Sequence, residues 1–175
     1  VNYEEWCNQW GCELFRVMKP GAPVVIFNST RTLAHVQVAL ETSGFYARDI
    51  IVYRRTSGIP KGYNAEQQLK RKGYERFQDW KGWHSCLRSE WEGIVVLQKP
   101  LSNNYTENIE KYGVGLFKTE YKESGFQSNI IENISRDSKE DFNVHCTVKP
   151  LKLMEKLVSM FVPDGDDHII LDPFA

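Results

Sequence analysis

Apolar residues along the first third of the chain follow two alternating spacings. Residues 4–18 carry them every three to four positions, the period of an amphipathic helix, and residues 32–42 repeat this pattern. Residues 24–27 and 50–53 are short apolar or β-branched runs, typical of strands buried on both faces of a parallel sheet. This alternation predicts an α/β fold with a mostly parallel sheet and helices on both of its faces.

The regular pattern stops near residue 56. Glycine and proline punctuate residues 56–82, where a polar helix is predicted over 65–72, so this stretch is expected to be an insertion into the core fold. The apolar run 93–98 predicts a strand that returns to the sheet. Residues 102–144 are polar and without a regular period, and an irregular stretch of that length inside a domain is usually functional or mobile.

The end of the chain regains regular patterning. Six apolar residues at helical spacing are predicted to pack in the core: Leu151, Leu153, Met154, Leu157, Val158 and Phe161. Ile169-Ile170-Leu171 is predicted to form a buried strand. Asp172-Pro173 ends it, because proline lacks the N–H that a ladder needs.

The composition is that of one globular domain. A chain of 175 residues with 41% hydrophobic and 13% aromatic residues can bury a core and is not disordered. It has no apolar run long enough for a membrane span and no signal peptide. Its four cysteines show no paired framework, which favours a reducing cytoplasm. Their spacings do not match those of zinc ligands, so no metal is predicted.

Positive charge is concentrated between Arg48 and Arg88. This stretch holds ten Lys or Arg against four Asp or Glu, although the whole chain has a net charge of -1. Aromatic residues interleave with these cations, which suits contact with DNA phosphates but also suits a solvated helix face or a domain edge. The candidate DNA contacts are Arg54, Arg55, Lys61, Lys70, Arg71, Lys72 and Arg76.

Two phrases near the end carry candidate ligand chemistry. Asp172 follows a predicted strand, and ligands of open α/β sheets bind beyond the carboxyl ends of strands. Thr147 precedes a helix whose first turn is expected to include Pro150, so its hydroxyl is placed to cap a helix start that favours anions, and Lys149 adds positive charge there. Each phrase alone is also typical of a plain strand end or a plain cap. Together they suit a zwitterionic amino acid group.

The same two phrases resemble the motif X to motif I junction of site-specific DNA amino-methyltransferases. The residues are His145-Cys146-Thr147-Val148-Lys149-Pro150 and Leu171-Asp172-Pro173-Phe174-Ala175, against the family's His-Pro-Thr-x-Lys-Pro and Asp-Pro-Phe-x-Gly-Ser-Gly. Residues 14–27 resemble the helix, turn and strand that follow the family's catalytic motif. Three further stretches, 58–61, 91–101 and 112–115, resemble segments of phage and prophage adenine-specific enzymes.

The resemblance implies a cofactor and residues that hold it. It implies a partial Rossmann-like fold that binds S-adenosylmethionine, with Asp172 at its ammonium, Thr147 and Lys149 at its carboxylate, and Phe174 lining the pocket. Pro173 and His145 complete the implied cofactor set.

The motif order implies the family's permuted layout. Residues 1–55 would form the catalytic half, residues 56–141 the target-recognition region with the returning strand 92–98, and residues 142–175 the cofactor segment. Cys146 stands where the family has proline. The (Asp/Asn/Ser)-Pro-Pro-aromatic tetrapeptide is absent and would precede Val1, so no catalytic residue is assigned. The chain is therefore expected to be an internal fragment, inactive alone and prone to self-association through unpaired strands.

The expected function is methyl transfer from S-adenosylmethionine to the exocyclic amine of a base in duplex DNA. Adenine N6 is favoured over cytosine N4 on the likeness of 91–101 and 112–115 alone. Two alternatives stay open, a DNA-binding module without catalysis and a methyltransferase acting on RNA or a small molecule.

Overall fold

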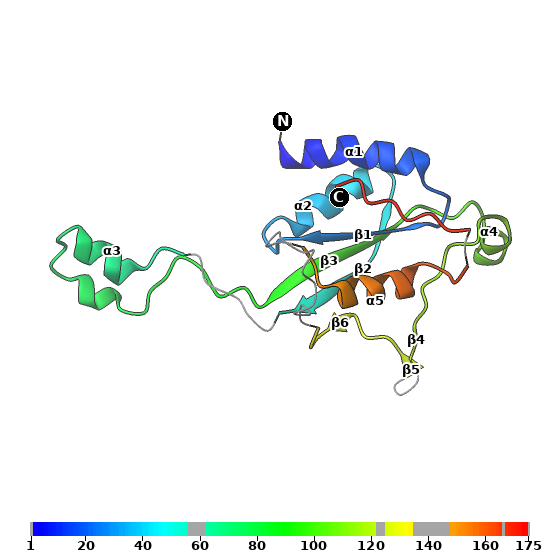
Figure 1. The fold of residues 1–175 in the computed structure, drawn as a ribbon. Coiled ribbons are helices and arrows are strands. Elements are labelled where there is room, and N and C mark those ends of the chain that lie inside the picture. Colours follow the sequence, from blue (N-terminus) through cyan, green and yellow to red (C-terminus); the bar gives the residue numbers. More distant parts are fainter. Residues whose placement is uncertain (1, 56–61, 122–124, 135–147, 166, 175) are drawn as a thin grey trace.

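The computed structural model of this protein describes residues 2–55, 62–121, 125–134, 148–165 and 167–174. Its elements in chain order (Figure 1) are α1 (Tyr3–Val17), β1 (Pro23–Asn28), α2 (Leu33–Thr42), β2 (Tyr46–Arg54), α3 (Ala65–Arg71), the 3-10 turn η1 (Phe77–Trp80), β3 (Trp91–Gln98), α4 (Tyr105–Tyr112), β4 (Glu120–Tyr121), β5 (Gly125–Phe126), β6 (Ile130–Ile131) and α5 (Leu151–Phe161).

The elements expected from hydrophobic spacing are confirmed through most of the chain. The confirmed segments are the helices at 4–18, 32–42 and 65–72 and the strands at 24–27, 50–53 and 93–98. β2 begins earlier than its apolar run, at Tyr46, because the preceding residues also pair with β3.

The sheet is mixed, so the expectation of a mostly parallel sheet is wrong. Its order is β1-β3-β2-β6, with β3 antiparallel to both β1 and β2, and β6 parallel to β2. The α2 crossover does keep β1 and β2 running in the same direction, but β3 returns between them. An apolar run such as 93–98 predicts burial on both faces and carries no information about strand direction.

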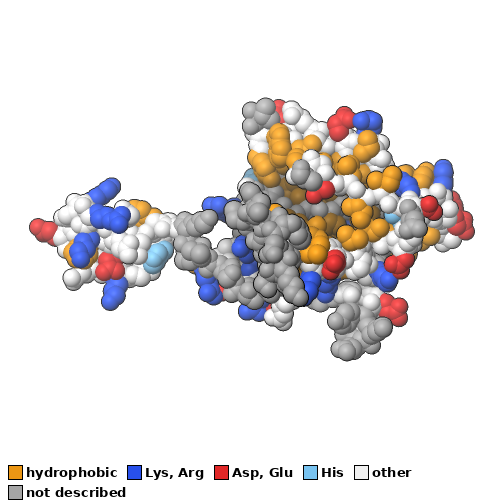
Figure 2. Space-filling model, in the orientation of Figure 1, with side chains coloured by type: hydrophobic (Ala, Val, Ile, Leu, Met, Phe, Trp, Pro, Cys, Tyr) orange, Lys and Arg blue, Asp and Glu red, His pale blue; other side chains and the backbone are white. Residues whose placement is uncertain are grey.

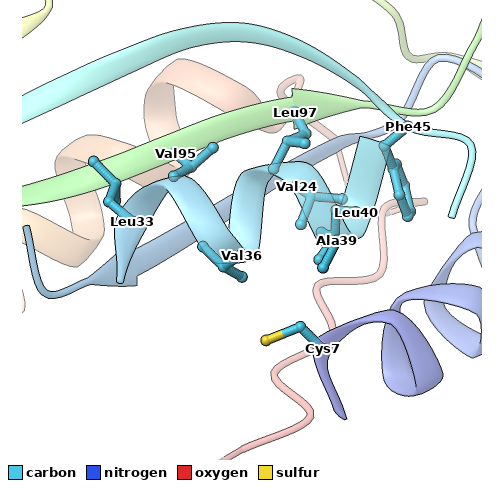
Figure 3. Packing of buried hydrophobic residues seen from close by; sticks show 9 residues of the cluster. All are labelled: Cys7, Val24, Leu33, Val36, Ala39, Leu40, Phe45, Val95 and Leu97. Atoms are coloured by element: carbon cyan, nitrogen blue, oxygen red, sulfur yellow. The ribbon is translucent and has the colours of Figure 1, made fainter. Parts of the chain in front are cut away.

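Helices cover both faces of this sheet, as expected, and each face has its own core (Figure 1). Side chains of β3 alternate between the two. Val95 and Leu97 pack with α1 and α2, whereas Ile94 and Val96 pack with α5. Figure 3 shows the first cluster, formed by Cys7, Val24, Leu33, Val36, Ala39, Leu40, Phe45, Val95 and Leu97. The α5 stripe is confirmed as core only for Leu153, Leu157 and Phe161. Its other three members, Leu151, Met154 and Val158, are exposed.

Residues 102–144 are not uniformly irregular, because α4 lies among them. The Asn104 side chain accepts a hydrogen bond from the Glu107 N–H at 3.0 Å and caps the helix. Gly113 ends it with φ 70°, a left-handed conformation that favours glycine. These local signals, an Asn-x-x-Glu start and a glycine stop, were present in the sequence.

One buried asparagine ties α4 to the start of the sheet. Asn108 donates to the carbonyls of Pro20 at 3.0 Å and Val114 at 2.8 Å. It leaves no room at Gly21, which has φ 79° and where an added Cβ would meet the Asn108 amide. Glycine is therefore required at position 21 by both conformation and space.

The strand expected at Ile169-Ile170-Leu171 does not form. These residues lie outside the assigned elements and are 95%, 60% and 58% exposed. A strand needs a hydrogen-bonded neighbour, and in the described part of the chain no sheet strand pairs with them. Apolar character alone therefore did not decide their structure.

Within the described residues, no helix combines the length and the apolar character that crossing a membrane would require.

Candidate functional site

A pocket of about 380 Å³ opens at one edge of the sheet. β1 and β2 both end at this edge, and β3, which is antiparallel to them, begins there. The lining residues follow from that geometry: Phe27, Asn28, Ser29 and Thr30 at the end of β1, Arg55 after β2, Ser89, Trp91 and Glu92 at the start of β3, and Lys149 before α5. Ligands of α/β folds bind at such carboxyl edges.

Glu92 is the electrostatic centre of the pocket. One of its carboxylate oxygens accepts from Arg55 at 2.8 Å and the other from Lys149 at 2.6 Å. The Lys149 Nζ also lies over the Phe27 ring, 5.2 Å from its centroid. Two cations face one carboxylate, so the pocket has a net positive charge and favours an anionic or polar ligand.

Asn28 holds the rim of the pocket in shape. Its Nδ2 donates to the Tyr3 hydroxyl at 2.7 Å, and its Oδ1 accepts from the Ser29 N–H at 2.7 Å and from the Thr32 hydroxyl at 2.6 Å. Burial raises the pKa of Tyr3, so its hydroxyl stays protonated. The turn that carries Ser29 and Thr30 is therefore anchored to α1 and α2.

The predicted cofactor residues fall into separate places. Lys149 lines the pocket, but Asp172 and Phe174 are not among its lining residues in the described chain. The exposed Asp172 accepts from the Phe174 N–H at 3.0 Å, and Pro173 lies in the same exposed turn. Thr147 and His145 lie outside the described residues.

The last helix begins one residue later than expected, and the cap predicted from Thr147 lies outside the described residues. α5 begins at Leu151, and Pro150 is its N-cap rather than part of its first turn. Among the described residues, no side chain makes a capping hydrogen bond there. Lys149, which was expected to add positive charge at this helix start, pairs with Glu92 at 2.6 Å.

An aromatic wall lies beside the Asp172 turn. The Phe174 ring lies 5.9 Å from Trp6 and 5.5 Å from Trp10, both on α1. The Trp10 Nε1 is buried and has no hydrogen-bond partner among the described atoms. A carboxylate and three aromatic rings therefore lie together at this end of α1.

The predicted basic patch is divided between the body and a projecting segment. Arg54 pairs with Glu132 at 2.9 Å and Arg55 with Glu92, both on the body. Lys70, Arg71, Lys72 and Arg76 lie on the segment made of residues 62–88, here called the arm, which projects from the body (Figure 1). Lys61 lies outside the described residues.

Two exposed cations at the end of α3 are without a partner in the described structure. These are Arg71 and Lys72, whereas Arg76 pairs with Asp79 at 2.7 Å and Lys70 lies over the Phe77 ring. Figure 2 shows Lys and Arg side chains distributed over the arm. The uncompensated charge of the predicted patch therefore lies on the arm rather than on the body.

Sequence reasoning missed most of the pocket. Ser29, Thr30 and Glu92 were not named as site residues. The polar residues Asn28, Ser29 and Thr30 follow a buried strand, which is the same signal that indicated Asp172. Trp91 and Glu92 belong to the stretch that resembles adenine-specific enzymes, but nothing local marks them as neighbours of Lys149.

A family model described as DNA methylase matches residues 1–175. The type II methyltransferase M.HindIII of Haemophilus influenzae is 30% identical over 182 residues, covering 99% of this chain and 58% of its own length. The chain therefore spans less than two thirds of that relative.

Two crystal structures of M1.HpyAVI have the same fold. The complex with SAM is 18% identical with a TM-score of 0.54, covering 91% of this chain and 60% of its own. The other structure is 16% identical to this chain and has a TM-score of 0.56. The match covers 95% of this chain and 64% of that structure's chain. The methyltransferase fold expected from the sequence is thereby confirmed.

Proposed function

Because the chain belongs to the DNA methylase family whose model spans all of it, we propose that its protein transfers a methyl group from S-adenosylmethionine to a base amine in duplex DNA. The observation that carries this proposal is the positively charged pocket at the carboxyl edge of the sheet, with Glu92 between Arg55 and Lys149. We propose that the pocket receives the extruded target nucleotide.

The composition of the pocket supports this role. Its volume of about 380 Å³ is within the usual range of small-ligand sites, roughly 300–1,000 Å³. Trp91 and Phe27 offer aromatic surface for stacking on a base, and the Ser29 and Thr30 hydroxyls can hydrogen-bond to its edge. Arg55, 43% exposed at the rim, can reach a phosphate oxygen.

Asp172 and the aromatic wall are the proposed cofactor site. The bound cofactor supplies an electrophilic methyl group. Asp172 would pair with its ammonium, and Phe174 with Trp6 and Trp10 would bound its adenine. The proposed contribution of these residues to the rate is to hold the cofactor in position. Thr147 and His145 remain proposed contacts, and for Lys149 the pairing with Glu92 favours the nucleotide pocket over the cofactor carboxylate.

Adenine N6 is the proposed target. Its support is the likeness of 91–101 and 112–115 to adenine-specific enzymes. The second of these stretches also has a scaffold role, because the Val114 and Gly115 carbonyls accept from Asn108 and Gln98. The stretch 91–101 contributes Trp91 and Glu92 to the pocket. The choice of base is therefore expected to depend on these two residues.

Contact with duplex DNA is proposed for the basic residues named from the sequence. Arg71 and Lys72 are the strongest candidates because no acidic partner offsets them in the described structure, whereas Arg54, Arg55 and Arg76 are paired. Lys61 and Lys70 complete the set. The division into catalytic, target-recognition and cofactor segments at residues 56 and 142 stays a prediction, as does the cytoplasmic location.

Self-association of this chain is also proposed. β1 is an edge strand of the described sheet, and Ile169, Ile170 and Leu171 expose apolar surface. Unpaired edges and apolar patches of this kind favour association between copies.

The test is a methyl-transfer assay with the whole protein, unmethylated genomic DNA and labelled cofactor, followed by nucleoside analysis. N6-methyladenine is the expected product, and N4-methylcytosine would overturn the choice of base. Asp172→Ala should weaken cofactor binding at least tenfold, measured by calorimetry. The matched control is Asp167→Ala, which removes another exposed carboxylate nearby. Transfer to RNA or a small molecule only, or no cofactor binding by the wild type, contradicts the proposal.

A further inference from the structure

The arm exposes large aromatic side chains although its two short helices bury no residue. Neither α3 nor η1 contains a buried residue. Yet the arm exposes large aromatic side chains: Tyr63 at 49%, Tyr74 at 47%, Trp80 at 43% and Trp83 at 63%. Exposed tryptophans that do not contribute to a core are characteristic of contact surfaces.

Trp83 is held by its backbone while its ring faces solvent. Its N–H donates to the Trp80 carbonyl at 3.1 Å, and its own carbonyl accepts from the Ala65 N–H at 3.0 Å. The two indole rings meet edge to face, with centroids 5.9 Å apart. The Trp83 ring is therefore presented in a prearranged position, which lowers the entropic cost of a contact.

The base of the arm adjoins the pocket. Arg55 and Ser89, which precede and follow the arm in sequence, line the pocket, and the Arg55 N–H donates to the Glu90 carbonyl at 2.7 Å. Further out, Asn64 and His84 form an antiparallel bridge. The residues that flank the arm in sequence therefore lie at the pocket, and the arm projects away from it (Figure 1).

The charge of the arm indicates which kind of molecule such a contact surface would bind. Residues 62–88 contain six Lys or Arg and three Asp or Glu. Arg71, Lys72 and Lys81 have no partner among the described residues, so positive charge and aromatic rings occupy the same short segment. Cations that contact phosphates next to rings that stack on bases form a nucleic-acid surface.

We propose that Trp83, positioned by Trp80, stacks on a nucleobase of the bound duplex beside the extruded nucleotide, while Arg71 and Lys72 contact the phosphates. This rests on the proposed function, because extrusion is what unstacks a base and leaves its face free. Trp83 is the contacting residue and Trp80 a positioning residue.

The experiment measures binding of the whole protein to unmethylated duplex DNA, and to the same duplex with one mismatched base, by fluorescence anisotropy over a salt series. Trp83→Ala should weaken binding about 5- to 150-fold, the loss that ~1–3 kcal/mol of stacking corresponds to. The salt slope should not change, and Trp83→Phe should retain most of the affinity. Arg71→Ala and Lys72→Ala should each lower the slope by about 1.

Leu87→Ala is the matched control, since Leu87 is an exposed apolar residue of the arm, 93% accessible, without a ring. It should bind like the wild type, and far-UV circular dichroism should be the same for all variants. The mismatched duplex should bind the wild type more tightly, and this preference should disappear in Trp83→Ala.

Wild-type affinity in Trp83→Ala overturns the proposal. So does a change in self-association on sedimentation with DNA affinity retained, which would make Trp83 a contact between copies of the protein. If the wild type methylates DNA and Trp83→Ala has the same kcat/KM, only the stacking proposal fails. If DNA binding depends on Trp83 but the wild type transfers no methyl group, the proposed function fails and the stacking contact stands.

Discussion

The side-chain amide of Gln98, buried at the end of the central strand, donates to the backbone carbonyl of Gly115 at 2.8 Å. The same amide donates to the Gly21 carbonyl at 2.7 Å, and its oxygen accepts from the Tyr46 hydroxyl at 2.7 Å. One residue therefore joins β3, the turn before β1 and the segment after α4. These three hydrogen bonds of Gln98, here called the belt, hold together the end of the sheet opposite the pocket.

Gln98→Leu should lower the free energy of unfolding by roughly 2–5 kcal/mol, because it leaves buried polar groups without a partner. Urea denaturation of the wild type and the variant is the measurement. Tyr46→Phe removes one of the same hydrogen bonds and should cost only about 1 kcal/mol. Equal stability of Gln98→Leu and the wild type would show that the belt does not stabilise the fold.

Lys99 should stabilise the end of α1. Its Nζ donates to the Phe15 carbonyl at 2.6 Å and the Met18 carbonyl at 2.9 Å, where the helix dipole favours a cation. Lys99→Met should lose about 1–2 kcal/mol of stability on thermal or urea unfolding. Lys81→Met, which removes an exposed cation without a partner in the described structure, should change it by less than about 0.5 kcal/mol. Similar losses in both variants would argue against a specific cap.

Glu92 should contribute more than a surface ion pair does. Its side chain is 20% exposed and that of Lys149 is 26%, so solvent screens this pair only partly. Glu92→Gln should cost about 1–2 kcal/mol, measured by urea unfolding, because it leaves Arg55 and Lys149 without the carboxylate that both pair with. Glu132→Gln, which breaks the exposed pair with Arg54, should cost less than about 0.5 kcal/mol. A double-mutant cycle with Lys149→Met should give a coupling energy, and its absence would contradict the pairing.

Cys7 should resist alkylation. It is fully buried, and burial raises the pKa of its thiol, so both access and thiolate content are low. With iodoacetamide at pH 8, peptide mass spectrometry should find Cys12, which is exposed, modified much faster than Cys7. In urea the two rates should become similar. Equal rates in the native protein would show that α1 does not stay packed on α2.

The same shift gives a dependence of stability on pH. The folded state disfavours the thiolate of Cys7. The contribution of the protonated thiol to the free energy of unfolding is therefore fully present below the ordinary thiol pKa of about 8.5. It is lost as pH rises through the higher pKa of the folded protein. Cys7→Ala should therefore flatten the fall in stability above pH 8.5, and an unchanged slope would contradict this.

The candidate site was predictable only in part. Asp172 was named because it follows a predicted strand, and that signal is local. Phe174 was named only because of the resemblance to the family's Asp-Pro-Phe motif. Glu92 and Lys149 are 57 residues apart in sequence and meet at 2.6 Å. Only the folded sheet edge brings them together, so no spacing rule could have indicated the pair.

The sequence by itself determined α1, α2, β1, β2 and β3, because hydrophobic period and terminal glycine or proline act within a few residues. It also contained the Asn104 and Gly113 signals of α4, which were overlooked. The tertiary structure alone decided that β3 lies antiparallel between β1 and β2, and that Ile169 to Leu171 form no strand. The physical reason is that strand direction and pairing depend on which neighbour supplies the hydrogen bonds, and that neighbour is distant in sequence.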